Sequence, residues 1–515
     1  MNSRLARLGD QQAIRDVLAR YWRGIDRGDA DLVRSTYHPD ARDDHGYVKG
    51  SLDGFIETLE PGVWSIFDRT QHFSGHIAVE LSGPDTAHAE SYAEAHHVRQ
   101  SGDGGDGGDG PGSDLVFGLR YVDRFERRDD EWRIADRVCT WDWHRVDEGL
   151  GMPLPDSYFR GSRDASDPVF GHPRRVGVRV AARDLVAKRA CYDALMRYAR
   201  GVDRCDPELV RSGYHPGAFD DHGGYQGDVD GFIPWVKEIV MDAYTCTMHK
   251  MGNVLIEVDG DQAYGETYAI AHHVDARAAE PTDLIMGVRY LDRFECRGGD
   301  WRVVHRVMSY EWERVATIGA QSFDASYAVG RRDGSDTALQ PPRNARPTTA
   351  VVPDDLEATR DRAAIYDQLV AYCRAVDRCD EALLRSVYHP DAHDDHGAYQ
   401  GDLEGFVEFV KTEVQARFRS TMHKLGNSFI ELDGDVAHCE TLAIGHHVRA
   451  EDGVDVDDLV LGIRYLDRFE RRHGEWRIAN RQLVFEWQRL DRLSPLDETW
   501  TPGRHDPSDP VYALR

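Results

Sequence analysis

Hydrophobic positions along the chain follow a helical spacing first and a strand-like spacing second. After Asp10, a plausible N-cap, residues Ile14, Val17, Leu18, Tyr21, Trp22 and Ile25 recur every three or four positions, which predicts an amphipathic helix. Shorter helical patterns cover 30–37 and 51–67. Four segments rich in β-branched and aromatic residues follow, separated by turn signals, at 76–81, 86–98, 114–126 and 131–144. The pattern predicts an α+β fold with about three helices against a curved, mostly antiparallel sheet of four or more strands.

This pattern occurs three times. Residues 421–427 read Thr-Met-His-Lys-Leu-Gly-Asn, residues 247–253 repeat them with one change, and residues 70–76 are an altered copy. The chain of 515 residues fits about three domains of ordinary size, roughly 100 to 200 residues each. We therefore expect domains at 1–172, 173–345 and 346–515, of which the first has diverged most and alone carries a Gly/Asp-rich loop at 101–112.

A polar tail with a shared signature follows the last predicted strand of each copy. The tails lie at 161–168, 330–336 and 503–510. Recurrence in all three copies predicts that the tails are ordered and wrap a neighbouring domain.

Composition excludes several classes of function. The net charge of −28 argues against binding to a nucleic-acid backbone. No apolar run approaches the ~18 residues of a membrane span, and the eight cysteines form no C-x-x-C pair, which favours a cytoplasmic protein. Since no Gly-rich nucleotide fingerprint is present, we expect no cofactor.

Six sets of polar residues coincide in all three copies. They are Asp26, Asp203 and Asp377; His45, His222 and His396; His72, His249 and His423; His96, His272 and His446; Arg137, Arg306 and Arg481; and Tyr21, Tyr198 and Tyr372. Each aspartate falls at the edge of the buried helical stripe, where a carboxylate is costly unless it has a partner. Such an aspartate could meet the histidine that enters the sheet and make it a general base near neutral pH. The alternative is a purely structural Asp–His pair that joins helix to sheet.

Adjacent histidines near the end of one predicted strand must point to opposite faces of the sheet, because strand side chains alternate. Only one of His96 and His97 can therefore reach the interior. The arginine on the last strand has the same ambiguity.

Several motifs together resemble the SnoaL-like branch of the NTF2-like superfamily. They are the Tyr-x4-Asp helix end, the Tyr-His-Pro-Asp-Ala-x-Asp-Asp-His-Gly segment, the Thr-x-His-x-x-Gly-Asn strand entry and the hairpin before Trp-Arg-Ile. That branch includes scytalone dehydratase, bile acid 7α-dehydratase and hexachlorocyclohexane dehydrochlorinase. The resemblance covers nearly all of each copy and implies three α+β cones in tandem.

The resemblance also implies roles for individual residues. The catalytic Asp–His dyad of those lyases falls on Asp26 with His72, Asp203 with His249, and Asp377 with His423. It matches the preceding tyrosine to Tyr21, Tyr198 and Tyr372, and the second catalytic histidine to His96, His272 and His446, which favours the first histidine of each pair as the inward one. It matches a pocket arginine to Arg137, Arg306 and Arg481. A substrate-activating tyrosine is replaced by His45, His222 and His396, which we expect to contact substrate.

The sequence therefore predicts a cofactor-independent lyase, of the dehydratase or dehydrohalogenase kind, acting on a small hydrophobic or aromatic hydroxylated substrate; isomerase or cyclase chemistry is compatible with the same residues. Because several of those enzymes are trimers, we expect one chain to form an intramolecular pseudo-trimer, as a monomer or within a higher homo-oligomer. Two other classes stay open. A metal-dependent enzyme would use His45, His72 and His96 with Asp26 or Asp43 as ligands. A non-catalytic ligand-binding or assembly protein would use the same cone without chemistry.

Overall fold

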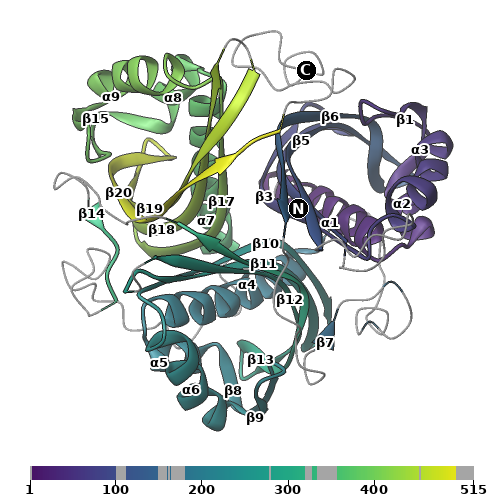
Figure 1. Ribbon diagram of the computed structural model, residues 1–515, viewed down its shortest axis with the longest axis horizontal. Helices are drawn as coiled ribbons and strands as arrows, with labels where there is room; N and C mark the ends of the chain where they lie inside the picture. Colours follow the sequence, from purple (N-terminus) through teal and green to yellow (C-terminus); the bar gives the residue numbers. More distant parts are fainter. Residues whose placement is uncertain are drawn as a thin grey trace.

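The chain folds into three similar units, each a curved sheet with helices on its concave side (Figure 1). The computed structural model describes residues 3–99, 112–148, 159–160, 163, 167, 180–277, 280–318, 328–332, 356–451 and 454–494. The predicted domain boundaries fall outside these residues. We name the units the first, second and third domain in chain order.

Helices and strands alternate in the same order in each domain. The first contains α1 (Ser3–Asp26), α2 (Ala30–Ser35), β1 (Tyr37–Asp44), β2 (Lys49–Ser51), α3 (Leu52–Leu59), η1 (Glu60–Trp64), β3 (Arg69–Leu81), β4 (Thr86–Arg99), β5 (Ser113–Arg128), β6 (Glu131–Glu148) and then β7 (Phe159–Arg160). The second contains α4 (Ala182–Asp203), α5 (Pro207–Ser212), β8 (Tyr214–Asp221), β9 (Gln226–Asp228), α6 (Val229–Val236), η3 (Lys237–Met241), β10 (Cys246–Asp259), β11 (Gln262–Asp275), β12 (Thr282–Arg297), β13 (Asp300–Thr317) and then β14 (Ala328–Val329). The third contains α7 (Leu356–Asp377), α8 (Glu381–Val387), β15 (Tyr388–Asp395), β16 (Gln400–Asp402), α9 (Leu403–Phe409), η5 (Val410–Gln415), β17 (Ser420–Asp433), β18 (Val436–Glu451), β19 (Val454–Arg472) and β20 (Glu475–Arg492).

The sheets are open rather than closed barrels. The first has the strand order β2-β1-β6-β5-β4-β3, and the other two repeat it. Within this order all neighbours are antiparallel except β1 and β6 and their counterparts, which run parallel. The short strands β7 and β14 add to the second and third sheets, also in parallel. The α+β prediction is confirmed. The predicted helix over 51–67 differs, because α3 ends at Leu59 and continues as the π-helical turn η1.

Each long first helix fills the concave face of its own sheet. In α1 the apolar stripe predicted from the sequence is buried, from Ile14 to Ile25, and packs with residues of β4 to β6 in one core. The second and third domains contain equivalent cores. Because the stripe ends at Asp26, the helix brings this carboxylate to β3 at the inner surface of the sheet.

The residues just before each described tail pair with the sheet of the next domain. Strand β7 pairs with β13 of the second domain, and β14 pairs with β20 of the third. Asp167 is buried against Arg289 of the second domain. In the second tail, Gly330 donates its backbone N–H to the carbonyl of Phe485 in the third domain. The described residues of the first two tails thus include contacts with the next domain, and the third tail lies outside the described residues.

Three edge strands meet where the domains join. Strands β3, β10 and β17 contact one another pairwise and lie around a common centre (Figure 1). Around them, the end of each first helix forms buried ion pairs with the following domain. Arg27 lies 3.0 Å from Glu311, Arg204 lies 3.2 Å from Glu486, and Arg374 of the third domain lies 3.5 Å from Glu90 of the first, which closes the ring. No described helix is long and apolar enough to cross a membrane.

Candidate functional site

In every domain a buried aspartate is hydrogen-bonded to one histidine of the edge strand. The Nδ1 atom of His72 lies 2.7 Å from Asp26 Oδ1, that of His249 lies 2.7 Å from Asp203 Oδ1, and that of His423 lies 2.6 Å from Asp377 Oδ1. The aspartate side chains are at most 2% exposed, whereas the histidines are 8%, 6% and 9% exposed. No described residue bonds the three Nε2 atoms. The predicted Asp and His are therefore brought together, with Nε2 as the atom left for a ligand.

The same aspartates complete the free edge of the sheet. The backbone N–H of each histidine donates to the second oxygen of its aspartate at 2.8 to 2.9 Å. In the second and third domains the hydroxyls of Thr247 and Thr421 donate to the first oxygen, Oδ1, of Asp203 and Asp377. Burial would raise the pKa of the three carboxyl groups, but the charge and hydrogen bonds of the histidine lower each pKa overall. The carboxylates are therefore ionised at neutral pH.

The inward member of each histidine pair is the second one, so the prediction for His96, His272 and His446 is wrong. His249 lies opposite Ala271 across the sheet, and directly opposed residues share a face. Alternation then places His273 beside His249 and His272 on the other face. The ring centroids of His97, His273 and His447 lie 5.3, 5.1 and 5.2 Å from those of the dyad histidines.

The second histidines are neutral. Burial, followed by the charge of the dyad histidine, lowers the pKa of His97 and His273 to about 3, and that of His447 to about 4. In the second and third domains their Nδ1 atoms donate to the carbonyls of Leu284 and Leu459 at 3.2 Å. Nε2 is then the acceptor atom of the ring.

The first histidines belong to the junction between domains. His96 stacks on Trp312 of the second domain, His272 packs against Trp487 of the third, and His446 stacks on Trp143 of the first, with ring centroids 3.9 to 4.6 Å apart. Their Nδ1 atoms bond Asp114, Asp283 and Asp458. These contacts fix the imidazoles facing away from the dyads.

A tyrosine, a histidine and an aspartate form a second chain inside each domain. The hydroxyls of Tyr21, Tyr198 and Tyr372 lie 3.1 to 3.2 Å from Nε2 of His45, His222 and His396. The Nδ1 atoms of these histidines bond Asp43, Asp220 and Asp394. With both ring nitrogens engaged, the histidines expected to contact substrate instead hold the tyrosines. Burial raises the pKa of each tyrosine, which keeps the hydroxyl protonated.

The arginines of the last strand pack against the tyrosines of these hydrogen-bonded groups. Arg137, Arg306 and Arg481 are fully buried and bind Asp123, Asp292 and Asp467 through two nitrogens. Their guanidinium carbons lie 3.9 to 4.3 Å from the ring centroids of Tyr21, Tyr198 and Tyr372. The structure thus places the predicted substrate-binding arginines in an ion pair behind the tyrosines.

The ligands proposed for a metal are not brought together. His45 is engaged by Tyr21 and Asp43, His72 by Asp26, and His96 lies on the opposite face of β4. Within the described ranges, no group of three or more His, Cys, Asp or Glu residues has the arrangement of a metal site. The residues proposed as metal ligands therefore do not form a common site in the described part of the chain.

Comparison with known proteins agrees with this repeated geometry. A sequence model described as the SnoaL-like domain matches residues 6–138, 183–307 and 357–482, which is most of the chain. The chain belongs to the SnoaL-like domain family. Each match contains one complete set of the paired aspartate, histidine and tyrosine residues described above.

Relatives of the SnoaL-like chain correspond to one domain. Uncharacterized proteins of Mycobacterium tuberculosis (strain ATCC 25618 / H37Rv) and Mycobacterium bovis (strain ATCC BAA-935 / AF2122/97) are 34% identical over 124 residues, which are 24% of this chain and 82% of each relative. Among solved structures, a Kribbella flavida protein is 20% identical with a TM-score of 0.24 and covers 25% of this chain and 94% of its own. The hexachlorocyclohexane dehydrochlorinase LinA-type3 of Novosphingobium barchaimii LL02 is 24% identical with a TM-score of 0.23, covering 28% and 95%.

The altered strand entry of the first SnoaL-like domain reflects its contacts with other domains. Its dyad has the same geometry as the others. Gln71 accepts from the indole of Trp312, Phe73 packs against Ile270, and His76 lies 3.4 Å from the backbone N–H of Leu425. The changed residues thus face the junction rather than the dyad.

Three functional groups of these SnoaL-like domains were missed in the sequence. The second histidines were visible but were assigned to the wrong face. The Asp-Leu pairs at 114, 283 and 458, which orient the first histidines, recur at equivalent positions and could have been found by that recurrence. The asparagines of the strand entry recur in two copies, but their role was not predicted, because their partners belong to another domain.

Proposed function

We propose that the chain is a cofactor-independent lyase that eliminates water or a similar leaving group from a small hydrophobic or aromatic substrate. The observation that carries the proposal is the dyad: an ionised, buried aspartate on Nδ1, and an Nε2 atom without a partner in the described residues. Nδ1–H donation to the carboxylate fixes the tautomer, so that the lone pair is on Nε2. The aspartate also stabilises the imidazolium that forms when Nε2 accepts a proton.

The remaining groups fit the two halves of an elimination. His249 and His423 would remove a proton from a carbon beside the leaving group, and the electrons of that C–H bond would form the double bond. The neutral Nε2 of His273 or His447 would accept a hydrogen bond from a substrate hydroxyl. The protonated Tyr198 or Tyr372 would supply the proton with which hydroxide departs as water, and its histidine and aspartate would orient it.

The test uses dyad variants and a panel of small hydroxylated or halogenated aromatic and alicyclic compounds, with the unsaturated product followed by absorbance. The triple variant His72→Ala/His249→Ala/His423→Ala, which removes all three dyads, should lose activity by about 100-fold or more, the usual contribution of a general base. His305→Ala, a half-buried histidine outside the site, is the matched control and should keep it. Undiminished turnover in the triple variant, measured on any compound that the parent converts, would end the proposal.

We also propose that the three domains form an intramolecular pseudo-trimer. It is supported by the cyclic ion pairs from Arg27, Arg204 and Arg374, and by the pairwise contacts of β3, β10 and β17. Small-angle scattering should give the compact profile of three packed units for the purified chain. A profile of three separate beads would refute the arrangement.

A further inference from the structure

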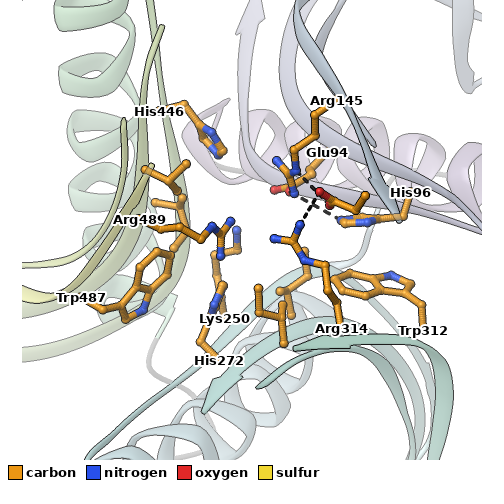
Figure 2. Close-up of a pocket in the computed structure, with 15 residues that line it drawn as sticks. Glu94, His96, Arg145, Lys250, His272, Trp312, Arg314, His446, Trp487 and Arg489 are labelled. Carbon is orange, nitrogen blue, oxygen red and sulfur yellow. Dashed lines mark hydrogen bonds and ion pairs between the residues drawn. The ribbon is translucent and has the colours of Figure 1, made fainter. Parts of the chain in front are cut away.

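A small cavity lies where the three domains meet (Figure 2). The first histidine of each pair lines it, so it lies on the side of the sheets away from the dyads. Its volume of about 20 Å³ is enough for one water molecule. Side chains from all three domains line it: Glu94, His96, Arg145 and Asp147 of the first, Lys250, Ile270, His272, Ile285, Trp312 and Arg314 of the second, and Ile444, His446, Val460, Trp487 and Arg489 of the third. A cavity of this size excludes an organic substrate.

Three equivalent contacts surround this cavity, and their chemistry differs. Strand register makes Phe73, Lys250 and Lys424 equivalent to one another, and likewise Glu94, Ile270 and Ile444. Between the first and second domains, Phe73 packs against Ile270. Between the third and first domains, Lys424 forms an ion pair with Glu94.

The third contact is incomplete. Gly426 of the third domain contacts Lys250, as Gly75 of the first contacts Lys424, so Lys250 occupies the same position between the second and third domains. The residue equivalent to Glu94 at that position is Ile444, which offers no charge. Lys250 therefore lacks the counterion that its counterpart Lys424 possesses.

The ammonium group of Lys250 has no hydrogen-bond acceptor or carboxylate partner among the described residues. The residue is 1% exposed, and its Nζ atom lies 4.5 Å from the ring centroid of Phe73. Burial, followed by the charge of Lys424, lowers the pKa of Lys250 well below its usual value, while Glu94 opposes this. Without an anion this environment favours the neutral amine, whereas an anion beside Nζ would stabilise the ammonium form.

Other donors around the cavity also make no hydrogen bond in the described residues, although Arg145 Nη1 lies 3.6 Å from Asp491 and Arg489 Nη1 lies 3.6 Å from Asp283. Buried Arg145 Nη1, Arg314 Nη2 and Arg489 Nη1 have no hydrogen bond in the described part of the chain. Each guanidinium comes from a different domain, and Figure 2 shows their side chains converging on the region of Lys250. The two lining carboxylates are already engaged, Glu94 by Lys424 and Asp147 by Arg145 and Arg314.

We propose that this cavity binds one small inorganic monoanion, of the size of chloride, as the counterion of Lys250. The anion would take the place at Lys250 that the carboxylate of Glu94 has at Lys424, and it would accept hydrogen bonds from the guanidinium nitrogens that make none in the described residues. It would stabilise the junction of the three domains independently of the lyase chemistry, since the dyads lie on the other face of the sheets.

Thermal unfolding in chloride tests the proposal. At constant ionic strength, with chloride exchanged for gluconate, which is too large for the cavity, the midpoint should rise by roughly 1 °C for each tenfold increase in chloride above the dissociation constant. Lys250→Met should remove this dependence, because an apolar side chain then faces Ile444. Ile444→Glu should also remove it and raise the midpoint at low chloride, because it rebuilds the pair formed by Lys424 and Glu94.

Lys237→Met is the matched control, since Lys237 is an exposed lysine paired with Asp242, and this variant should keep the chloride dependence of the parent. A second measurement needs no variant: crystals of the parent soaked in bromide should give an anomalous peak inside the cavity. A parent protein insensitive to chloride, the same dependence in all variants, or bromide-soaked crystals without a peak at this position would each overturn the proposal.

Discussion

The asparagine that ends the strand entry of one domain holds the dyad strand of another domain. The side chain of Asn253 donates to the carbonyl of His72 at 2.9 Å and accepts from the N–H of Ser74. Asn427 makes the same two bonds to His249 and Met251. Strand β3 is the edge of its sheet, so these backbone groups have no ladder partner of their own.

Replacing Asn253 by alanine should therefore weaken the first domain rather than the second, which carries the mutation. Two buried backbone groups would lose their partners, at about 1 to 3 kcal/mol each, so opening of β3 should become easier by about 2 to 6 kcal/mol. Even the lower value corresponds to roughly 30-fold faster amide exchange. Hydrogen–deuterium exchange with mass spectrometry measures this on peptides from residues 69–81.

Two controls make the result specific. Strand β17 in the same molecule has no contact with Asn253 in the hydrogen-bond pattern and should keep its protection, and Asn427→Ala should move the loss to β10. Unchanged exchange in β3 of Asn253→Ala, together with loss in β10 alone, would show that the domains do not clamp one another.

Three further predictions concern the buried charges. The pKa of His273 lies at about 3 in the folded chain and near 6.5 when unfolded, so its contribution to stability is complete above pH ~6.5 and is lost as the pH falls toward 3. In that window His273→Gln should reduce the change of the free energy of unfolding with pH, measured by urea unfolding, by about 1.4 kcal/mol per pH unit. An unchanged slope would contradict the neutral buried state. Arg306→Met should destabilise the chain by about 3 to 5 kcal/mol in urea unfolding, because Asp292 is left buried and unpaired, and adding Asp292→Leu should recover much of the loss; no recovery would refute a purely structural ion pair. Glu94→Gln should cost a similar amount at low chloride by leaving Lys424 unpaired, and Lys424→Met in the same chain should restore stability, which differential scanning calorimetry can check.

Local patterns predicted most of each domain. The three-and-four spacing of apolar residues located α1, and β-branched segments located the long strands, because both patterns depend on residues close in sequence. The helix end and the strand entry recur together in three copies, and this recurrence predicted that Asp26 and His72 are partners. The structure shows them hydrogen-bonded. The helical pattern over 51–67 did not reveal the change to a π-helical turn after Leu59.

The orientation of the adjacent histidines required the tertiary structure. Alternation along a strand states that His272 and His273 face opposite ways, but it does not say which face is concave. The neighbouring domain determines which histidine faces the concave side, because Trp487 of the third domain covers the face that carries His272. Resemblance to single-domain enzymes suggested the opposite assignment.

By itself, the sequence determined the number of repeats, the α+β elements and the pairing of helix-end aspartates with strand-entry histidines. Only the tertiary structure decided which histidine faces each dyad, which domain each asparagine binds, and that Lys250 and Ile444 line one cavity at the junction where Lys424 pairs with Glu94. The physical reason is that burial and charge pairing at a junction depend on side chains hundreds of residues apart. A repeat shows which residues are equivalent, but the chemistry of each contact is set by the residue on the other side of it.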